Sequence, residues 1–268
     1  MTRLAGKVAI VTGASANIGG ALAAGLAAEG AKLVCTDVSA DVAAASVARI
    51  EKAGGEALAV VGDVTDPAHV ADVVEQALNR WGHIDVLVNN AVWFNQKSLL
   101  TMPLEEYRRQ LDIILGGAFL FTRAVGQAMI DGQVAGSIIN VLSTAAWQGQ
   151  PGNIGYTTGK SGLINFTRSA AMEFAEYGIR VNGFTPTATQ PEDLELVARL
   201  ATALAGQPGP YAMDFMEQFP MKRLPTPTDY VPTVVFLASD DSQMITGSNI
   251  TVDGGATAKY WPWRPQQG

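Results

Sequence analysis

The chain has 268 residues, a formal net charge of −7 and a sequence pI of about 4.8. This acidic balance offers no positive field to hold a polyanion, which argues against binding to nucleic acid or to an anionic membrane. The single cysteine, Cys35, excludes an internal disulfide, and two isolated histidines, His69 and His83, do not predict a metal site. No apolar run reaches the roughly 18 residues of a membrane helix and no signal-peptide pattern is present, so we expect a cytoplasmic protein that acts on a small molecule.

Short runs rich in Val and Ile alternate along the chain with segments of helical periodicity. Strands this apolar, with little alternation, are typical of a parallel sheet that helices cover on both faces. The pattern predicts a single doubly wound α/β domain over residues 1–268. The predicted strands are 7–13, 32–37, 57–63, 84–90, 137–143, 179–186 and 249–255, and the predicted helices are 18–29, 39–53, 67–80, 103–130, 153–177 and 228–238.

The stretch TGASANIG, residues 12–19, lies between the first predicted strand and the first predicted helix. A strand, a glycine turn and a helix N-terminus form an anion site, because free N–H groups and the helix dipole point at the same place. Gly13 would permit the turn, and Gly19 would let strand and helix approach closely. Asn17 stands where a middle glycine would admit a phosphate, although asparagine tolerates positive φ better than most residues. By itself the stretch is equally consistent with a structural turn.

Asp37 ends the second predicted strand, where a carboxylate can accept hydrogen bonds from a ribose diol. Its charge would repel a 2′-phosphate, and no Lys or Arg lies within 13–20 to offset it, which favours NAD over NADP. Asp37 could also cap the helix that follows it. Asp63 and Val64 follow the third strand and Asn90 follows the fourth, at the edge of the sheet where ligands bind in open α/β folds.

Tyr156 and Lys160 stand four residues apart in the run YTTGK, so on a helix they share one face. An ordinary tyrosine has a pKa of about 10, and a neighbouring ammonium or an oxidised nicotinamide favours its phenolate form. Ser143 ends the fifth predicted strand and could present its hydroxyl to the same substrate oxygen. Each residue alone has an ordinary structural explanation, but the three together, after a nucleotide-type turn, favour a catalytic site.

At these residues the chain resembles the short-chain dehydrogenase/reductase family over nearly its whole length. The motifs are TGASANIG at 12–19, DVT at 63–65, NNA at 89–91, Ser143 before YTTGK, and a C-terminal run ending in NITVDGG. The resemblance implies a Rossmann-like sheet of seven strands, a nicotinamide cofactor and usually a homotetramer. It also implies that Tyr156 donates or accepts the proton, that Lys160 anchors the ribose and lowers the tyrosine pKa, and that Ser143 orients the substrate. The expected cofactor contacts are Gly13, Ser15, Asn17, Ile18, Gly19, Asp37, Asp63, Val64, Asn90, Ala91, Tyr156, Lys160 and Thr189.

Several positions depart from the family pattern. Asn17 and Val92 replace family glycines, and Thr187 replaces the glycine after Pro186. The most consequential departure is Ile114, at the position of a catalytic asparagine that usually holds a water beside the lysine in the proton-exit path. Isoleucine can neither donate nor accept a hydrogen bond. Two functions therefore stay open: an NAD-dependent alcohol dehydrogenase or ketone reductase, and an NAD-binding homologue with impaired or no turnover. A sugar-nucleotide epimerase is less consistent with the chain length.

Aromatic and apolar side chains near these motifs favour a bulky hydrophobic secondary alcohol or ketone as the substrate. The expected substrate contacts are Trp93, Ser143, Ala145, Trp147 and Met213, and Phe184 is expected either in this pocket or in the core. The region 186–227 lacks the alternating rhythm and is predicted to be a substrate loop. The aromatic tail, residues 256–268, is expected to pack on a neighbouring subunit or over its active site, because exposure would leave a large apolar patch. The alternative is a disordered, unused tail.

Overall fold

A seven-stranded parallel sheet forms the centre of the protein. The structure is a computed structural model, which describes residues 2–193, 198, 211 and 219–260. The strand order is β3-β2-β1-β4-β5-β6-β7, and every neighbouring pair is parallel. The predicted doubly wound, Rossmann-like sheet is therefore confirmed. The strands are β1 Val8–Thr12, β2 Lys32–Asp37, β3 Ala57–Val61, β4 Val86–Asn89, β5 Ser137–Val141, β6 Arg180–Thr185 and β7 Asn249–Thr251.

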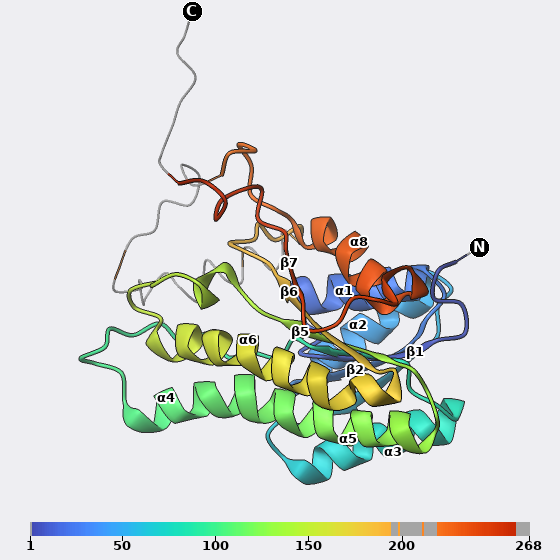
Figure 1. The fold of residues 1–268 in the computed structure, drawn as a ribbon. Coiled ribbons are helices and arrows are strands. Elements are labelled where there is room, and N and C mark those ends of the chain that lie inside the picture. The colour runs from blue at the N-terminus through green and yellow to red at the C-terminus, as the bar shows by residue number, and fades with distance from the viewer. Residues whose placement is uncertain (1, 194–197, 199–210, 212–218, 261–268) are drawn as a thin grey trace, which may run out of the picture.

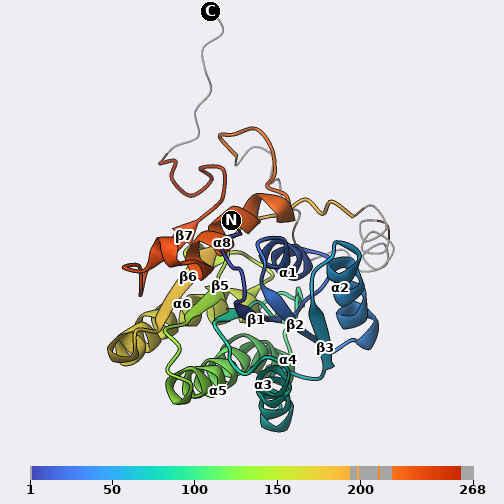
Figure 2. The same ribbon diagram turned by 90° about the vertical axis from the view of Figure 1, so that its right-hand side faces the viewer.

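Helices cover both faces of the sheet, with α1, α2 and α8 on one face and α3, α5 and α6 on the other (Figure 1, Figure 2). Because both faces are covered, all residues of β1 and β5 are buried, which explains their continuous apolar character. The helices are α1 Ile18–Ala28, α2 Ala40–Lys52, α3 Pro67–Trp81, α4 Leu104–Leu111, α5 Gly117–Asp131, α6 Ile154–Phe174 and α8 Pro227–Ala238.

Two predicted elements differ from those observed. The predicted helix 103–130 is divided by a π-helical segment, Asp112–Gly116, between α4 and α5. A single wide turn of this kind leaves the apolar periodicity nearly unchanged, so the pattern does not reveal it. The predicted strand 249–255 ends early because the Asp253 carboxylate accepts hydrogen bonds from the backbone N–H groups of Gly255 (2.9 Å) and Thr257 (2.8 Å), which turns the chain. Most of the predicted substrate loop and residues 261–268 of the aromatic tail lie outside the described residues.

The continuous helical stretch Leu104–Asp131 is, by length and composition alone, apolar enough to cross a membrane. Within the fold, however, the side chains of Phe121, Val125 and Met129 are fully buried in the core layer beneath the sheet. The apolar character of this helix is thus explained by its packing against the strands.

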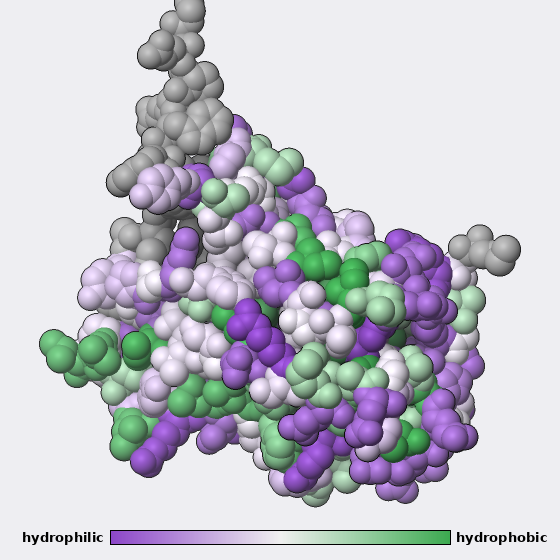
Figure 3. Space-filling view, viewed as in Figure 1, coloured by the Kyte–Doolittle hydropathy of each residue, from purple (hydrophilic) through white to green (hydrophobic). Residues whose placement is uncertain are grey.

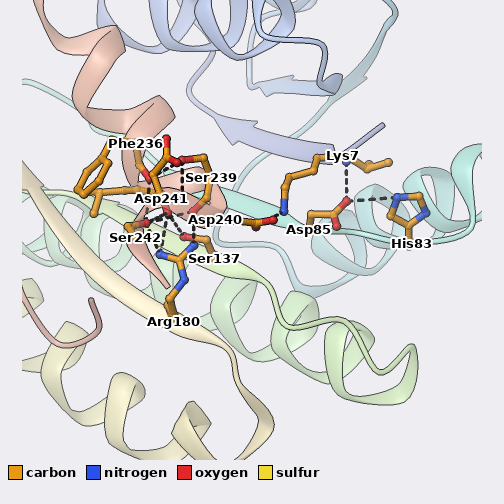
Figure 4. A network of polar contacts seen from close by, with 12 residues as sticks. Lys7, His83, Asp85, Ser137, Arg180, Phe236, Ser239, Asp240, Asp241 and Ser242 are labelled. Carbon is orange, nitrogen blue, oxygen red and sulfur yellow. Dashed lines mark hydrogen bonds and ion pairs between the residues drawn. The ribbon is translucent and has the colours of Figure 1, made fainter. Parts of the chain in front are cut away.

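Arg180, at the start of β6, binds the carboxyl end of α8 from inside the protein (Figure 4). The side chain is 9 % exposed, and its guanidinium donates to the carbonyls of Leu237 (2.9 Å) and Ser239 (3.1 Å) and to the Ser242 hydroxyl (2.7 Å). A cation at a helix C-terminus also interacts favourably with the helix dipole. Because burial penalises the charge, the pKa of Arg180 is lowered. This contact joins the last helix to the sheet.

Arg180→Met is expected to lower the free energy of unfolding by about 1.5–3 kcal/mol, because buried carbonyl oxygens lose a charged donor. Denaturant unfolding of the purified protein measures this effect. The matched control is Arg80→Met. Arg80 forms an ion pair with Glu56 at the surface, where the two side chains are 44% and 45% exposed. That surface pair should contribute about 0–1 kcal/mol. Equal losses in the two variants would contradict the role of Arg180.

Candidate active site

A cavity of about 350 Å³ opens at the carboxyl edge of the sheet, where β1, β2, β3 and β4 end. Five of the predicted cofactor contacts line it, Gly13, Asp37, Asp63, Val64 and Ala91, and so does Trp93, a predicted substrate contact. The cavity also contains residues that the sequence did not indicate as cofactor contacts: Val38, Gly62, Val92, Arg109 and Ile113. Since ligands of open α/β sheets bind at this edge, the cavity is the expected place for the adenosine half of a dinucleotide.

The glycine turn between β1 and α1 has no room for larger residues at two positions. Gly13 has φ +63°, and a Cβ there would lie 2.7 Å from the Cα of Ala91. A Cβ at Gly19 would collide with the carbonyl oxygen of Gly13, so both glycines are required by close backbone packing. The turn is closed by the Ser15 N–H, which donates to the Gly13 carbonyl (2.8 Å), and Ile18 begins α1. This geometry suits a phosphate at the helix N-terminus.

Asn17 occupies the N-cap position of α1 without making a side-chain cap. Its φ is −95°, so the positive φ that the sequence suggested for this position is not needed. The Oδ1 atom of Asn17 is buried and has no hydrogen-bond partner among the described residues. A buried amide oxygen without a partner is unusual in a folded protein, which makes Asn17 the least satisfied residue of the turn.

Asn90 fastens this turn to β4. Its side-chain Nδ2 donates to the carbonyls of Thr12 (3.1 Å) and Gly13 (2.8 Å). The backbone N–H groups of Asn90 and Ala91 donate to the Thr12 hydroxyl at 3.0 and 3.1 Å. Asn90 therefore fixes the shape of the glycine turn from behind.

Asp37 lines the cavity and at the same time accepts a hydrogen bond from the Ser39 backbone N–H (3.0 Å) at the start of α2. The two interpretations of Asp37, a cavity residue and a helix-start residue, are thus compatible. Burial raises the pKa of Asp37, and the backbone hydrogen bonds from Ser39 and Val38 partly oppose this effect.

Arg109 brings a positive charge into the same cavity from α4. Its guanidinium forms an ion pair with Asp63 and donates to the Thr65 hydroxyl (2.7 Å). Burial alone would raise the pKa of Asp63, but the hydrogen bonds from Thr65 and the contact with Arg109 outweigh it, so this pKa is lowered. The charge of Arg109 is therefore already paired inside the protein.

Ser143, Tyr156 and Lys160 come together beyond the carboxyl end of β5. Ser143 follows the strand and accepts a hydrogen bond from the Ala145 N–H (3.1 Å), while Tyr156 and Lys160 lie one turn apart on α6. Burial raises the pKa of Tyr156, and a hydrogen bond with Ser143 opposes that rise. The Nζ atom of Lys160 lies 5.8 Å from the centre of the Tyr156 ring and donates to the Val141 carbonyl (2.5 Å).

Lys160 is 3 % exposed, and burial lowers its pKa to about 7. Because the pKa in the unfolded chain is 10.5, the unfolded state binds more protons between pH 7 and 10.5. We therefore expect Lys160 to make the free energy of unfolding rise across this window, and to destabilise the protein fully below it. Denaturation curves of the wild type and Lys160→Met at several pH values test this. The free energy of unfolding that Lys160→Met gains over the wild type should decrease as pH rises from 7 to 10.5. A gain that does not depend on pH would contradict the lowered pKa of Lys160.

Ile114 lies in the π-helical segment and is 2 % exposed. It packs with Ala118, Leu142 and Leu163 in a small apolar cluster beside Tyr156. A Cβ at Gly159 would lie 3.0 Å from the Ile114 side chain, so the segment and α6 are in close contact. The position of the family asparagine is thus part of a packed apolar layer. π-Helical turns often occur at functional sites, and this one places Ile114 against the helix of the catalytic candidates.

One aromatic side chain, Phe94, contacts the candidate catalytic group directly. Trp93, Phe94 and Trp147 are partly exposed, and the Phe94 ring meets the Tyr156 ring edge-on with centres 5.4 Å apart. Phe184 instead lies in the core, fully buried against Tyr230, so its placement in the substrate pocket was wrong and the core alternative holds.

Thr189, a further predicted cofactor contact, is held by hydrogen bonds within the protein. The hydroxyl of Thr189 is hydrogen-bonded to the Tyr230 hydroxyl (2.8 Å) and donates to the Thr187 carbonyl (2.7 Å). Met213 lies outside the described residues. No group of three or more His, Cys, Asp or Glu side chains able to hold a metal ion occurs in the described part of the chain.

A doubly wound sheet with a glycine turn, an acid after β2 and a Ser, Tyr and Lys group at its carboxyl edge defines the class of dinucleotide-binding oxidoreductases. A family model described as enoyl-(acyl carrier protein) reductase matches residues 13–257. The chain belongs to the short-chain dehydrogenase/reductase family, whose members act on small-molecule alcohols and ketones with a nicotinamide cofactor.

Individual relatives are similar over nearly their full lengths. The 3-oxoacyl-[acyl-carrier-protein] reductase of Synechocystis sp. is 38% identical over 95% of this chain and 98% of its own. The structure of an NAD⁺-bound xylitol dehydrogenase is 31% identical, with a TM-score of 0.85 over 94% of this chain and 100% of its own. A chain from Beutenbergia cavernae, solved with NADP at low occupancy, is 32% identical, with a TM-score of 0.82 over 96% and 99%. The relatives thus include complexes with either cofactor.

Proposed function

We propose that this protein is an NAD-dependent oxidoreductase that interconverts a bulky hydrophobic secondary alcohol and the corresponding ketone. The observation that carries the proposal is that Ser143, Tyr156 and Lys160 converge at the same carboxyl edge of the sheet as the cavity lined by Gly13 and Asp37, the expected place for the adenosine half of a dinucleotide. The glycine turn, which has no room for a Cβ at Gly13 or Gly19, fits the diphosphate of the cofactor.

In this mechanism Tyr156 accepts the proton of the substrate hydroxyl in the oxidative direction and returns it in the reductive direction. Ser143, which is close enough to Tyr156 to oppose the rise in its pKa, orients the substrate oxygen. Lys160 in its ammonium form favours the phenolate of Tyr156 by Coulomb attraction and is placed to bind the cofactor ribose. When bound, NAD supplies the acceptor for the hydride.

The preference for NAD rests on the charges of the cavity. The Asp37 carboxylate can accept hydrogen bonds from ribose hydroxyls and would repel a 2′-phosphate. Arg109, the cation in this cavity, is paired with Asp63 and so does little to offset that repulsion. A bulky hydrophobic substrate is supported by the exposed aromatic side chains of Trp93, Phe94 and Trp147.

A second candidate function is an NAD-binding homologue with impaired or no turnover. It is favoured by Ile114, which fills the place of a water-holding asparagine with an apolar side chain. Hydride transfer does not require that position, whereas proton exit from Lys160 normally uses it. Both candidates bind NAD, so cofactor binding alone does not separate them.

The experiment that separates the two is an assay of NADH absorbance with purified protein and a panel of hydrophobic alcohols and ketones. Turnover with NAD or NADH, and much weaker turnover with NADP or NADPH, supports the dehydrogenase. Saturable NADH binding without turnover across a broad panel supports the second candidate. Turnover of NADPH as fast as NADH would refute the proposed cofactor preference.

The assembly and location of the protein are part of the same proposal. A cytoplasmic homotetramer with no nucleic-acid or membrane partner is supported by the acidic pI and by exposed apolar side chains on the helices, such as Phe119 on α5 and Met172 on α6. Light scattering of the purified protein measures the number of subunits, and a monomer would refute the tetramer.

A further inference from the structure

The segment of residues 92–97, between β4 and α4, places Phe94 against the candidate acid–base residue. The rings of Phe94 and Tyr156 meet at an interplanar angle of 74° with centres 5.4 Å apart. An aromatic side chain in this position forms an apolar wall beside the Tyr156 ring. Whatever holds the segment therefore determines where this wall stands relative to a substrate at Tyr156.

Glu106 and Gln110, one turn apart on the same face of α4, hold this segment. The Glu106 carboxylate accepts hydrogen bonds from Asn95 Nδ2 (2.5 Å) and Lys97 Nζ (2.7 Å). The side-chain amide of Gln110 donates to the carbonyls of Trp93 (3.1 Å) and Asn95 (3.4 Å). The two carbonyls bound by Gln110 are those on either side of Phe94, so the amide fixes the backbone from which the ring projects.

Gln110 is fully buried, at 0 % exposure, which is unusual for a glutamine. Its Oε1 atom leaves no room for a Cβ at Gly155 and has no hydrogen-bond partner among the described residues. The side chain is thus enclosed between residues 92–97 and the first turn of α6, which carries Tyr156. Burying an amide is unfavourable unless its polar groups are used, and in Gln110 the NH₂ group is the part that is used.

Residues 92–97 lie next to an exposed apolar surface and are bridged to the start of α6. Figure 3 shows hydrophobic side chains at the end of the molecule where Figure 1 places the chain before α4, and Leu99, Leu100 and Leu104 are exposed there. On the same side, an isolated parallel bridge pairs Lys97 with Asn153 at the start of α6. Residues 92–97 are therefore fixed at the Lys97 end, and Gln110 fixes their middle.

We propose that Gln110 is a positioning residue that determines substrate specificity, because it holds Phe94 in place as an apolar wall beside Tyr156. The inference rests on the proposed function, in which Tyr156 is the acid–base residue. Loss of the Gln110 amide releases the backbone around Phe94, and the ring then moves away from Tyr156. A bulky ketone, which uses the wall formed by Phe94, loses more than a small ketone, which does not reach it.

The first test does not depend on turnover. Fluorotyrosine is incorporated into the protein, and the fluorine NMR signal of Tyr156 is identified as the one missing in Tyr156→Phe. Because this signal lies beside the Phe94 ring, it should shift in Phe94→Leu and in Gln110→Met, while the other tyrosine signals stay in place. The matched control is Gln127→Met, an exposed glutamine on α5 whose amide donates to Asp131 (2.8 Å). An unmoved Tyr156 signal in Gln110→Met overturns the inference.

The second test uses steady-state kinetics with one bulky and one small ketone. Gln110→Met should raise KM for the bulky ketone about tenfold, because about one hydrogen bond's contribution to holding the wall is lost. The affinity for NADH should stay unchanged. The double variant with Phe94→Leu should be no worse than Phe94→Leu alone, because both changes act through one ring. Additive losses, or equal losses for both ketones, overturn the inference. If Gln110→Met does not fold, Gln110→Leu removes the donor with a smaller side chain and without burying a charge, and the same outcomes apply.

Discussion

Tyr156→Phe is expected to lower kcat by about 10²–10⁴-fold, the usual contribution of a positioned acid–base group. The phenylalanine ring keeps the edge-on packing against Phe94 but removes the hydroxyl that transfers the proton. Affinity for NADH should change little, because the glycine turn and Asp37 are untouched. The measurement combines steady-state turnover with the best substrate of the panel and NADH binding by fluorescence.

The control for this variant is Tyr177→Phe, since Tyr177 is an exposed tyrosine in a short 3₁₀ turn after α6. It should keep the activity of the wild type. Turnover of Tyr156→Phe within about threefold of the wild type would show that another group transfers the proton. A threefold difference is far smaller than the loss expected when a positioned acid–base group is removed.

Asp37→Ser is expected to shift the cofactor preference toward NADP. Serine removes the carboxylate that repels a 2′-phosphate and that binds the ribose diol, and a hydrogen bond to a charged group contributes about 1.5–3 kcal/mol. We therefore expect kcat/KM with NAD to fall about 10–100-fold and kcat/KM with NADP to rise, as measured with both cofactors at one fixed substrate concentration.

The matched control for Asp37→Ser is Asp41→Ser. Asp41 is exposed in the first turn of α2, so its substitution removes the same charge outside the cavity. Its cofactor preference should equal that of the wild type. An Asp37→Ser variant whose ratio of NADP to NAD activity matches that of Asp41→Ser would contradict the role assigned to Asp37.

Much of the fold could be predicted because the signals are local. The continuous apolar runs of β1 and β5 report burial on both faces, and the Asp66-Pro67 pair marks the start of α3, where the Asp66 side chain accepts from the Ala68 N–H (2.9 Å). The π-helical segment around Ile114 could not be predicted, because the sequences before and after it both show helical spacing and so indicate one continuous helix.

The candidate site was predictable where one motif supplies neighbouring residues. Tyr156 and Lys160 share a helix face by spacing alone, and Gly13 and Asp37 end adjacent strands. Arg109 was missed because it lies on α4, far along the chain from Asp63 and Thr65 after β3. Gln110 was missed because its contacts, the carbonyls of Trp93 and Asn95, depend on how the segment before α4 folds back on the helix. Their only sequence signal is a helix that carries Glu106, Arg109 and Gln110 directly before Ile114, and which side each faces depends on tertiary packing.

The central claim, hydride transfer to and from a carbon that bears oxygen, is tested most directly by isotope transfer. The protein is incubated with a hydrophobic ketone and NADH that carries deuterium on the reactive nicotinamide carbon, and the alcohol product is analysed by mass spectrometry. We predict that deuterium appears on the carbinol carbon with the wild type and is nearly absent with Tyr156→Phe. Saturable binding of NADH with no deuterium in any alcohol across the panel would contradict the claim.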